Sequence, residues 1–202
     1  MSNFNLDSEN TVYFDVLKEI GNIGCGNAST ALAQMLNRKV DMLVPKVRLL
    51  EFNEVGSILG GEEQIMAGIY LMVEGDITGS IMFLLEKECA RNLVAMLMCT
   101  EPSTEEQFSE IEHSALKEIG NIITASYLNS LSTLTNLSIY PSVPALCIDM
   151  AGAILSVPAI EFGLIGDKIL LIENEFSEGL NGYFILVPDL DSYDKIFASI
   201  GM

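Results

Sequence analysis

The chain has 202 residues, half of them apolar, so it is long enough to bury a sizeable core and is not intrinsically disordered. Its 28 acidic and 10 basic residues give a net charge of −18, which repels nucleic-acid phosphates and anionic membrane surfaces. We therefore expect no nucleic-acid partner and favour a partner with a basic patch. The single histidine, His113, leaves no material for Ser-His-Asp or multi-histidine metal chemistry, and we expect it at the surface.

A cytoplasmic location is expected from the cysteines and from the two segments that could be mistaken for membrane or export signals. Residues 1–13 have neither the basic nor the apolar region of a secretory signal. The stretch 119–148 contains no charge, but 11 of its 30 residues are Asn, Ser or Thr and two are Pro, which argues against insertion into a membrane. None of the four cysteines has C-x-x-C spacing, and we expect all of them to be buried, reduced thiols: Cys25, Cys89, Cys99 and Cys147.

The first half of the chain predicts a long helix followed by a strand pair. Apolar residues recur at spacings of three and four from residue 12 to about 36, with an N-cap at Asp7-Ser8. A short extended segment is expected at 40–44. Alternating apolar residues then predict strands at 65–73 and 79–85. The predicted apolar stripe of the helix is Leu17, Ile20, Gly24, Ala28, Ala31 and Met35.

The second half repeats this plan. After a short helix at 86–98 and an acidic, proline-containing boundary near 99–112, a second long helix is predicted. An extended segment at 137–140, strands at 168–173 and 182–187, and a short helix at 191–200 follow. The predicted stripe of the second long helix is Leu116, Ile119, Ile123, Tyr127, Ser130 and Leu134.

An internal match at an offset of 99 residues explains the doubled plan. Residues 17–23 and 116–122 both read LKEIGNI. Two long copies indicate a duplication, so we expect a single domain over 1–202 built from two repeats, about 8–99 and 107–202. The predicted fold class is α+β: duplicated helix-plus-hairpin units, related by a pseudo-two-fold axis, forming a largely antiparallel sheet with two long helices packed on it.

Each long helix also presents an unusual polar face. Asp15, Glu19, Asn22 and Gly26 fall within about 60° of one another opposite the apolar stripe, and Ser114, Glu118, Asn121 and Ala125 match them at the offset. Asn and Gly are unfavourable inside helices, so a Gly placed before Asn in both copies indicates a face that something approaches closely. Two ordinary explanations stay open: a solvated face without function, or a seam between helices.

The segment GNIGCG at 21–26 does not predict a nucleotide site. It follows a helical pattern rather than a strand, it lacks the order G-x-G-x-x-G, and no Gly-Lys-Ser/Thr follows it.

Written in full, the repeated motif is Asp/Ser-x3-Glu-x2-Asn-x22-Pro, and it ends at Pro45 and Pro144. This pattern resembles the signature of the CheC/CheX/FliY family of chemotaxis phosphatases, and the resemblance covers nearly the whole chain. Two motifs in about 200 residues resemble the CheC type, because CheX has one site per chain and FliY has an additional C-terminal domain. The resemblance implies hydrolysis of the aspartyl phosphate on the response regulator CheY.

The family likeness also implies a role for each motif residue. Asn22 and Asn121 would position the attacking water, and Glu19 and Glu118 would engage the regulator. Asp15 and Ser114 would contribute to docking, whereas Pro45 and Pro144 would shape the chain as it leaves the first strand of each half. No cofactor of the chain's own is expected, because the phosphorylated regulator supplies Mg²⁺.

The likeness further implies a second partner, CheD, a receptor deamidase that would modulate the activity; apart from these complexes we expect a monomer. Asp149 stands alone in the apolar segment 145–155, where it is either an ordinary exposed strand residue or part of a CheD contact. The alternative function is a non-catalytic adaptor that binds CheY or CheD in the chemotaxis or flagellar switch system, like the middle domain of FliM.

Overall fold

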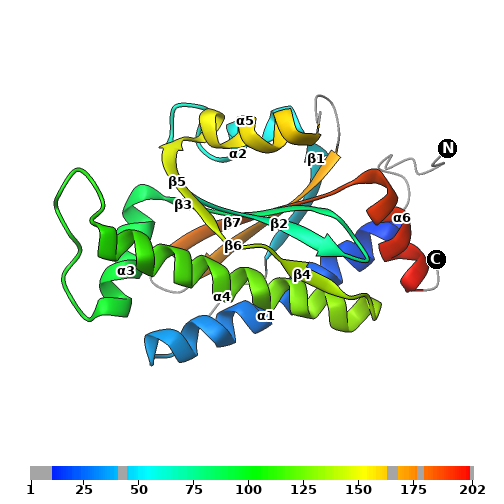
Figure 1. Cartoon of the computed structure of the whole chain (residues 1–202), viewed down its shortest axis with the longest axis horizontal. Helices are drawn as coiled ribbons and strands as arrows, with labels where there is room; N and C mark the ends of the chain where they lie inside the picture. Colours follow the sequence, from blue (N-terminus) through cyan, green and yellow to red (C-terminus); the bar gives the residue numbers. More distant parts are fainter. Residues whose placement is uncertain (1–10, 41–44, 163–167, 177–179, 201–202) are drawn as a thin grey trace.

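The computed structural model describes residues 11–40, 45–162, 168–176 and 180–200, and in it a seven-stranded sheet lies between two layers of helices (Figure 1). Two long helices, α1 (Thr11–Leu36) and α4 (Glu110–Thr135), pack side by side on one face. They run in opposite directions in Figure 1. This arrangement confirms the predicted α+β class and the pair of long helices on the sheet.

The start of α4 is determined by local hydrogen bonds. Ser109 is the N-cap: its Oγ accepts from the backbone N–H of Glu112 at 3.3 Å, and the Glu112 carboxylate accepts from the Ser109 N–H at 2.7 Å. The Ser109 N–H thereby holds the pKa of Glu112 below its ordinary value. At the other end, Asn136 takes the left-handed conformation, with φ of 55°. The N-cap expected at Asp7-Ser8 lies outside the described residues.

The buried stripes of both helices differ from the prediction near their C-terminal ends. In α1, Leu32 and Leu36 are buried, whereas Ala31 and Met35 are only half-buried. In α4, Leu134 is exposed. The period of a straight helix is not an integer, so a stripe read at fixed spacings drifts away from the sheet over seven turns.

Every paired strand in the sheet is antiparallel to its neighbour. The order is β1-β6-β7-β3-β2-β4, with β5 also paired to β2 beside β4. Read outward from the central β7–β3 pair, β6 then β1 lie on one side, and β2 then β5 on the other. The strands are β1 (Lys46–Glu51), β2 (Ile65–Gly75), β3 (Gly79–Glu86), β4 (Ile139–Pro141), β5 (Ala145–Met150), β6 (Lys168–Phe176) and β7 (Leu180–Pro188).

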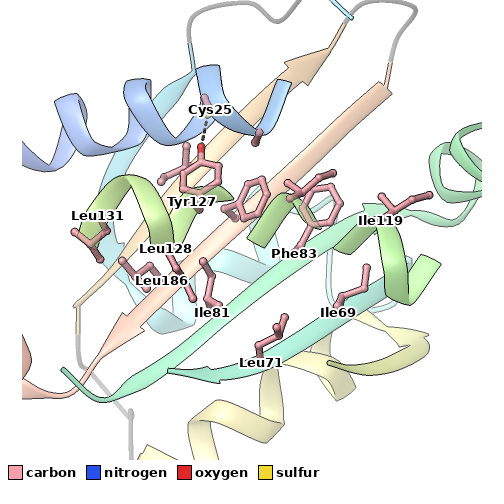
Figure 2. Packing of buried hydrophobic residues seen from close by; sticks show 14 of the residues in the cluster. Cys25, Ile69, Leu71, Ile81, Phe83, Ile119, Tyr127, Leu128, Leu131 and Leu186 are labelled. Atoms are coloured by element: carbon pink, nitrogen blue, oxygen red, sulfur yellow. Dashed lines mark hydrogen bonds between the residues drawn. The ribbon is translucent and has the colours of Figure 1, made fainter. Parts of the chain in front are cut away.

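Alternation along the central strands supplies two hydrophobic cores. Phe83, labelled in Figure 2, and Phe184 belong to the core on the side of α1 and α4, and their rings stack with centroids 4.6 Å apart. The neighbouring residues Met82, Leu84 and Ile185 point to the opposite face. Two short helices, α3 (Lys87–Met98) and α6 (Leu190–Ser199), complete the core on the side of the long helices.

The opposite face is covered by elements that the sequence analysis did not predict. They are η1 (Phe52–Glu54), α2 (Val55–Ile58) and the 12-residue helix α5 (Ala151–Phe162), which lie above the sheet in Figure 1. The sequence of α5 is apolar almost throughout and contains Pro158, so it shows no polar face from which a helical period can be read. Strand β1 was also missed, and most of the extended segment expected at 40–44 lies outside the described residues.

Two of the four cysteines contradict the expectation that all are buried. Cys25 and Cys89 are buried, but Cys99 and Cys147 are exposed. Cys99 ends α3 in the left-handed conformation, with φ of 54°, and Cys147 lies on β5, where exposed and half-buried residues alternate. His113 is exposed, as expected. Within the described ranges, no helix is both long and apolar enough to cross a membrane.

Two glycines on the long helices allow a matched test of helix–sheet packing. A Cβ at Gly120 would lie 2.7–2.9 Å from three side-chain carbons of Ile69, whereas a Cβ at Gly26 would meet no described atom within 4 Å. We expect Gly120→Ala to lower the free energy of unfolding by about 1–2 kcal/mol, because overpacking outweighs the gain in helix propensity. Gly26→Ala should raise it by up to about 1 kcal/mol. Urea unfolding measures both, and stabilisation by Gly120→Ala would contradict this packing.

Candidate functional site

The first motif occupies the outer face of α1. Asp15, Glu19 and Gly26 are exposed, and Asn22 is half-buried at the border between this face and the core. Leu17 and Ile20, on the other side of the same two turns, are buried in the core beneath the sheet. The polar face predicted from helical spacing is thus presented to solvent.

The second motif occupies the equivalent face of α4 with small differences. Ser114 and Glu118 are exposed, and Asn121 and Ala125 are half-buried. The Ser114 hydroxyl donates to the backbone carbonyl of Glu110 at 3.0 Å, one turn earlier in its own helix. Asp15, at the matching position of α1, is a carboxylate and cannot make that bond. The two faces therefore share Glu and Asn but differ at the position expected to contribute to docking.

The glycine before each Asn faces the sheet and not an outside partner. A Cβ at Gly21 would lie 2.8 Å from the Cγ2 atom of Val47 on β1, and Gly120 contacts Ile69 on β2 in the same way. The interpretation that these glycines admit an approaching partner is wrong for these two positions. They let the helix backbone lie close to the sheet, and the Asn that follows each of them is placed about 100° further round the helix.

The side-chain amides of the two Asn residues are in different environments. The Oδ1 atom of Asn22 is buried and has no hydrogen-bond partner among the described residues. A buried acceptor of this kind costs about 1–3 kcal/mol. Asn121 has no such buried, unpartnered atom. At the first site, the structure thus holds an amide whose capacity to accept a hydrogen bond is unused.

One contact between α1 and α4 was not anticipated from the sequence. The Tyr127 hydroxyl lies against the Cys25 thiol (Figure 2) and donates to the backbone carbonyl of Gly21 at 3.3 Å. The sequence does contain one indication of this contact, a difference in side-chain size between the two repeats. Tyr127 matches Ala28 at the 99-residue offset, so one helix has an aromatic ring where the other has a methyl group. Burial raises the pKa of Cys25 to about 12, against a smaller opposing effect of its hydrogen bond to Tyr127, so the thiol is protonated at neutral pH.

The remaining predicted residues lie away from the two helix faces. Pro45 is buried immediately before β1, and Pro144 is half-buried between β4 and β5. Pro144 thus follows a strand, as expected, whereas the residues just before Pro45 lie outside the described ranges. Asp149 is exposed on β5 opposite Met66, and its Oδ1 accepts from the Met150 N–H at 2.8 Å.

Two surface hollows among the described residues lie away from both motifs. One surface hollow, of about 630 Å³, is lined by α3 and the loop that follows it, and another, of about 880 Å³, by residues 47–58; no motif residue lines either. Among the described residues, no group of three or more His, Cys, Asp or Glu could hold a metal ion. An exposed helix face suits a macromolecular partner better than a small molecule, which binds in a concave site.

Comparisons with known proteins agree with the motif. The profile of the CheC-like family matches residues 15–48 and 111–148, which include both motifs and both prolines. The CheY-P phosphatase CheC of Bacillus subtilis is 38% identical over 194 residues, covering 93% of each chain. The chain belongs to the CheC-like family.

Solved structures agree on the fold. FliY of Thermotoga maritima superposes with a TM-score of 0.74 at 24% identity, over 93% of this chain and 95% of that one. The structure of a CheX-CheY-BeF3-Mg²⁺ complex from Borrelia burgdorferi also matches, with a TM-score of 0.52 at 16% identity, over 82% of this chain and 94% of that one. Proteins of this family with distant sequences therefore share this three-layer arrangement.

Proposed function

We propose that this protein hydrolyses the aspartyl phosphate of phosphorylated CheY. The observation that carries the proposal is the pair of outward Glu–Asn faces on α1 and α4, at Glu19, Asn22, Glu118 and Asn121. Similarity along almost the full chain to a protein named CheY-P phosphatase CheC supports it. Exposed helix faces suit a substrate that is itself a folded protein.

In this proposal the Asn amide positions the water that attacks phosphorus. An amide does not titrate near neutral pH, so Asn22 and Asn121 act by holding the water in line and not as general bases. Both Asn side chains are half-buried on the outer faces of α1 and α4, which supports this role because a water bound between the helix and the regulator can reach them. Positioning one water contributes about 10²-fold in rate, or about 2.7 kcal/mol of the barrier.

The Glu residues determine where the regulator docks. Glu19 and Glu118 lie one turn before each Asn, and we propose that they contact the active-site Lys of the regulator while Asp15 and Ser114 extend the contact. The regulator supplies the Mg²⁺ of its own phosphorylation site, so this chain contributes carboxylates and amides only. The protein's net charge of −18 favours association with a basic surface.

The two sites belong, in our proposal, to two repeats of one domain, about 8–99 and 107–202. The sheet order supports this. At one edge β1 pairs with β6, which lies beside β7, and at the other edge β5 pairs with β2, which lies beside β3. In each case the strand that follows the motif proline in one repeat pairs with the first hairpin strand of the other repeat. The two separate matches of the family profile also support it.

We further propose that CheD modulates the activity through the region of Asp149. This carboxylate is exposed on β5, and α5, which follows directly, has exposed apolar side chains at Val157 and Ile160. Met150 is also exposed. Exposed apolar side chains beside a carboxylate suit a protein interface.

Loss of both amides should abolish hydrolysis. We expect Asn22→Ala and Asn121→Ala each to lower the rate of CheY-phosphate decay, and the double variant to fall about 10²-fold. Loss of phosphate from the labelled regulator measures the rate, and circular dichroism confirms folding. A double variant that is folded and keeps most of the activity contradicts the water-positioning role. A wild-type protein that binds phosphorylated CheY without speeding decay is an adaptor.

Charge reversal at the Glu positions should weaken docking and not folding, because both side chains are exposed. We expect Glu19→Lys with Glu118→Lys to reduce the affinity for beryllofluoride-activated CheY by roughly tenfold or more, through repulsion of the regulator's Lys. Titration calorimetry measures the affinity. Glu62→Lys with Glu63→Lys makes the same change in net charge at exposed positions on the opposite side of the sheet and should have a smaller effect. Unchanged affinity in the Glu19/Glu118 double reversal rejects this docking geometry.

The Asp149 proposal separates CheD binding from hydrolysis. We expect Asp149→Lys to abolish co-purification with CheD while basal CheY-phosphate hydrolysis stays at the wild-type rate, because β5 does not contribute to the Glu–Asn faces. Co-purification and the decay assay on the same preparation measure both. Normal CheD binding by the folded variant removes this segment from the interface.

A further inference from the structure

The helical turn that presents Asn22 is intrinsically weak. Three glycines, Gly21, Gly24 and Gly26, fall within six residues of α1, and each of them lowers the stability of a helix and widens the conformational freedom of its backbone. In α4 the corresponding turn has only Gly120, followed by bulkier residues. The first site therefore depends more than the second on contacts from outside its own helix.

Tyr127 supplies such a contact from α4. A Cβ at Gly24 would lie 2.5 Å from the Cδ1 and Cε1 atoms of the Tyr127 ring, so the ring lies flat against α1 in the space that a side chain would need. The ring also packs against Phe184 of the central strand β7, with centroids 4.3 Å apart. The side chain is 5% exposed, which fixes its rotamer by packing.

The Tyr127 hydroxyl acts on the peptide group that ends at Asn22. It donates to the Gly21 carbonyl oxygen, and that oxygen belongs to the planar Gly21–Asn22 peptide unit. A hydroxyl that donates its one proton in this way accepts from the protonated thiol of Cys25, one turn further along α1. One side chain of α4 thus holds the peptide plane before Asn22 and the turn that follows it.

The second site has no equivalent clamp. The residue that matches Tyr127 at the 99-residue offset is Ala28, which has no hydroxyl to donate to the peptide before Asn121. Gly120 is held instead by its contact with Ile69 on the sheet. The two sites share a motif and differ in what immobilises it.

We propose that Tyr127 is a positioning residue for the first site only: its hydroxyl fixes the Gly21–Asn22 peptide so that the Asn22 amide is aligned for catalysis. This inference rests on the proposed function. Tyr127 is buried between α1 and the sheet whereas Glu19 is exposed, so loss of the Tyr127 hydroxyl should reduce turnover at the first site and leave docking unchanged.

Variants with a single working site isolate the effect. Asn121→Ala leaves only the first site, and Asn22→Ala leaves only the second. We expect Tyr127→Phe to lower kcat about fivefold in the Asn121→Ala background, as for loss of one hydrogen bond, with KM for phosphorylated CheY unchanged. In the Asn22→Ala background, Tyr127→Phe should leave both kcat and KM unchanged.

Controls separate positioning from a general loss of structure. Tyr140→Phe, which removes an exposed hydroxyl from β4, should change neither site. Equal losses at both sites, or a rise in KM at the first site, overturn the proposal, as does an unchanged kcat in the Asn121→Ala background. If the wild-type protein does not speed the decay of CheY-phosphate, the proposed function fails before Tyr127 is tested. If the double Asn variant retains full activity, the water-positioning role fails while hydrolysis stands. Both results are distinguishable from a failure of the Tyr127 proposal alone.

Discussion

This structure depends on how closely the backbones of the two long helices can approach the sheet and each other. At Gly21, Gly24 and Gly120 an added Cβ would lie within 3 Å of a neighbouring side chain, on β1, α4 and β2 respectively. Each glycine costs helix stability, and the cost is offset because the helices can then bury more apolar surface against the strands. Only the glycine side of each helix can lie this close to its neighbour, so the glycines determine how each helix is rotated about its own axis.

That rotation also determines the chemistry that the outer faces can perform. With Gly21 and Gly120 against the sheet, the next residue in each helix falls at the border of the core, and Glu19 and Glu118 fall in solvent. The Asn side chain is then half-buried, and the Glu carboxylate lies in solvent where it can meet a partner. A rigid helix fixes this spacing better than a loop can.

Local periodicity explains which parts were predictable. The long helices, the two hairpins and both polar faces follow from spacings of 3.6 and 2 within short windows, so they could be predicted from the sequence. Helix α5 could not, because its apolar surface lacks a polar face and includes Pro158. Exposure of Cys147 depends on β5 pairing with β2, about 80 residues away in sequence. The Tyr127 contact depends on where two helices cross, which no local pattern contains.

Packing between α1 and α4 also explains why the two sites cannot be held in place by identical contacts. Near a two-fold axis, corresponding residues of the two halves face the same small volume, and two large side chains would not fit at protein packing density. Under the proposed duplication, Tyr127 in one half corresponds to Ala28 in the other, and Gly24 makes room for the Tyr127 ring. Once the two repeats have side chains of different size between α1 and α4, each Asn is supported by different neighbours. An outer motif can therefore stay the same in both halves while the packing that aligns it becomes specific to each.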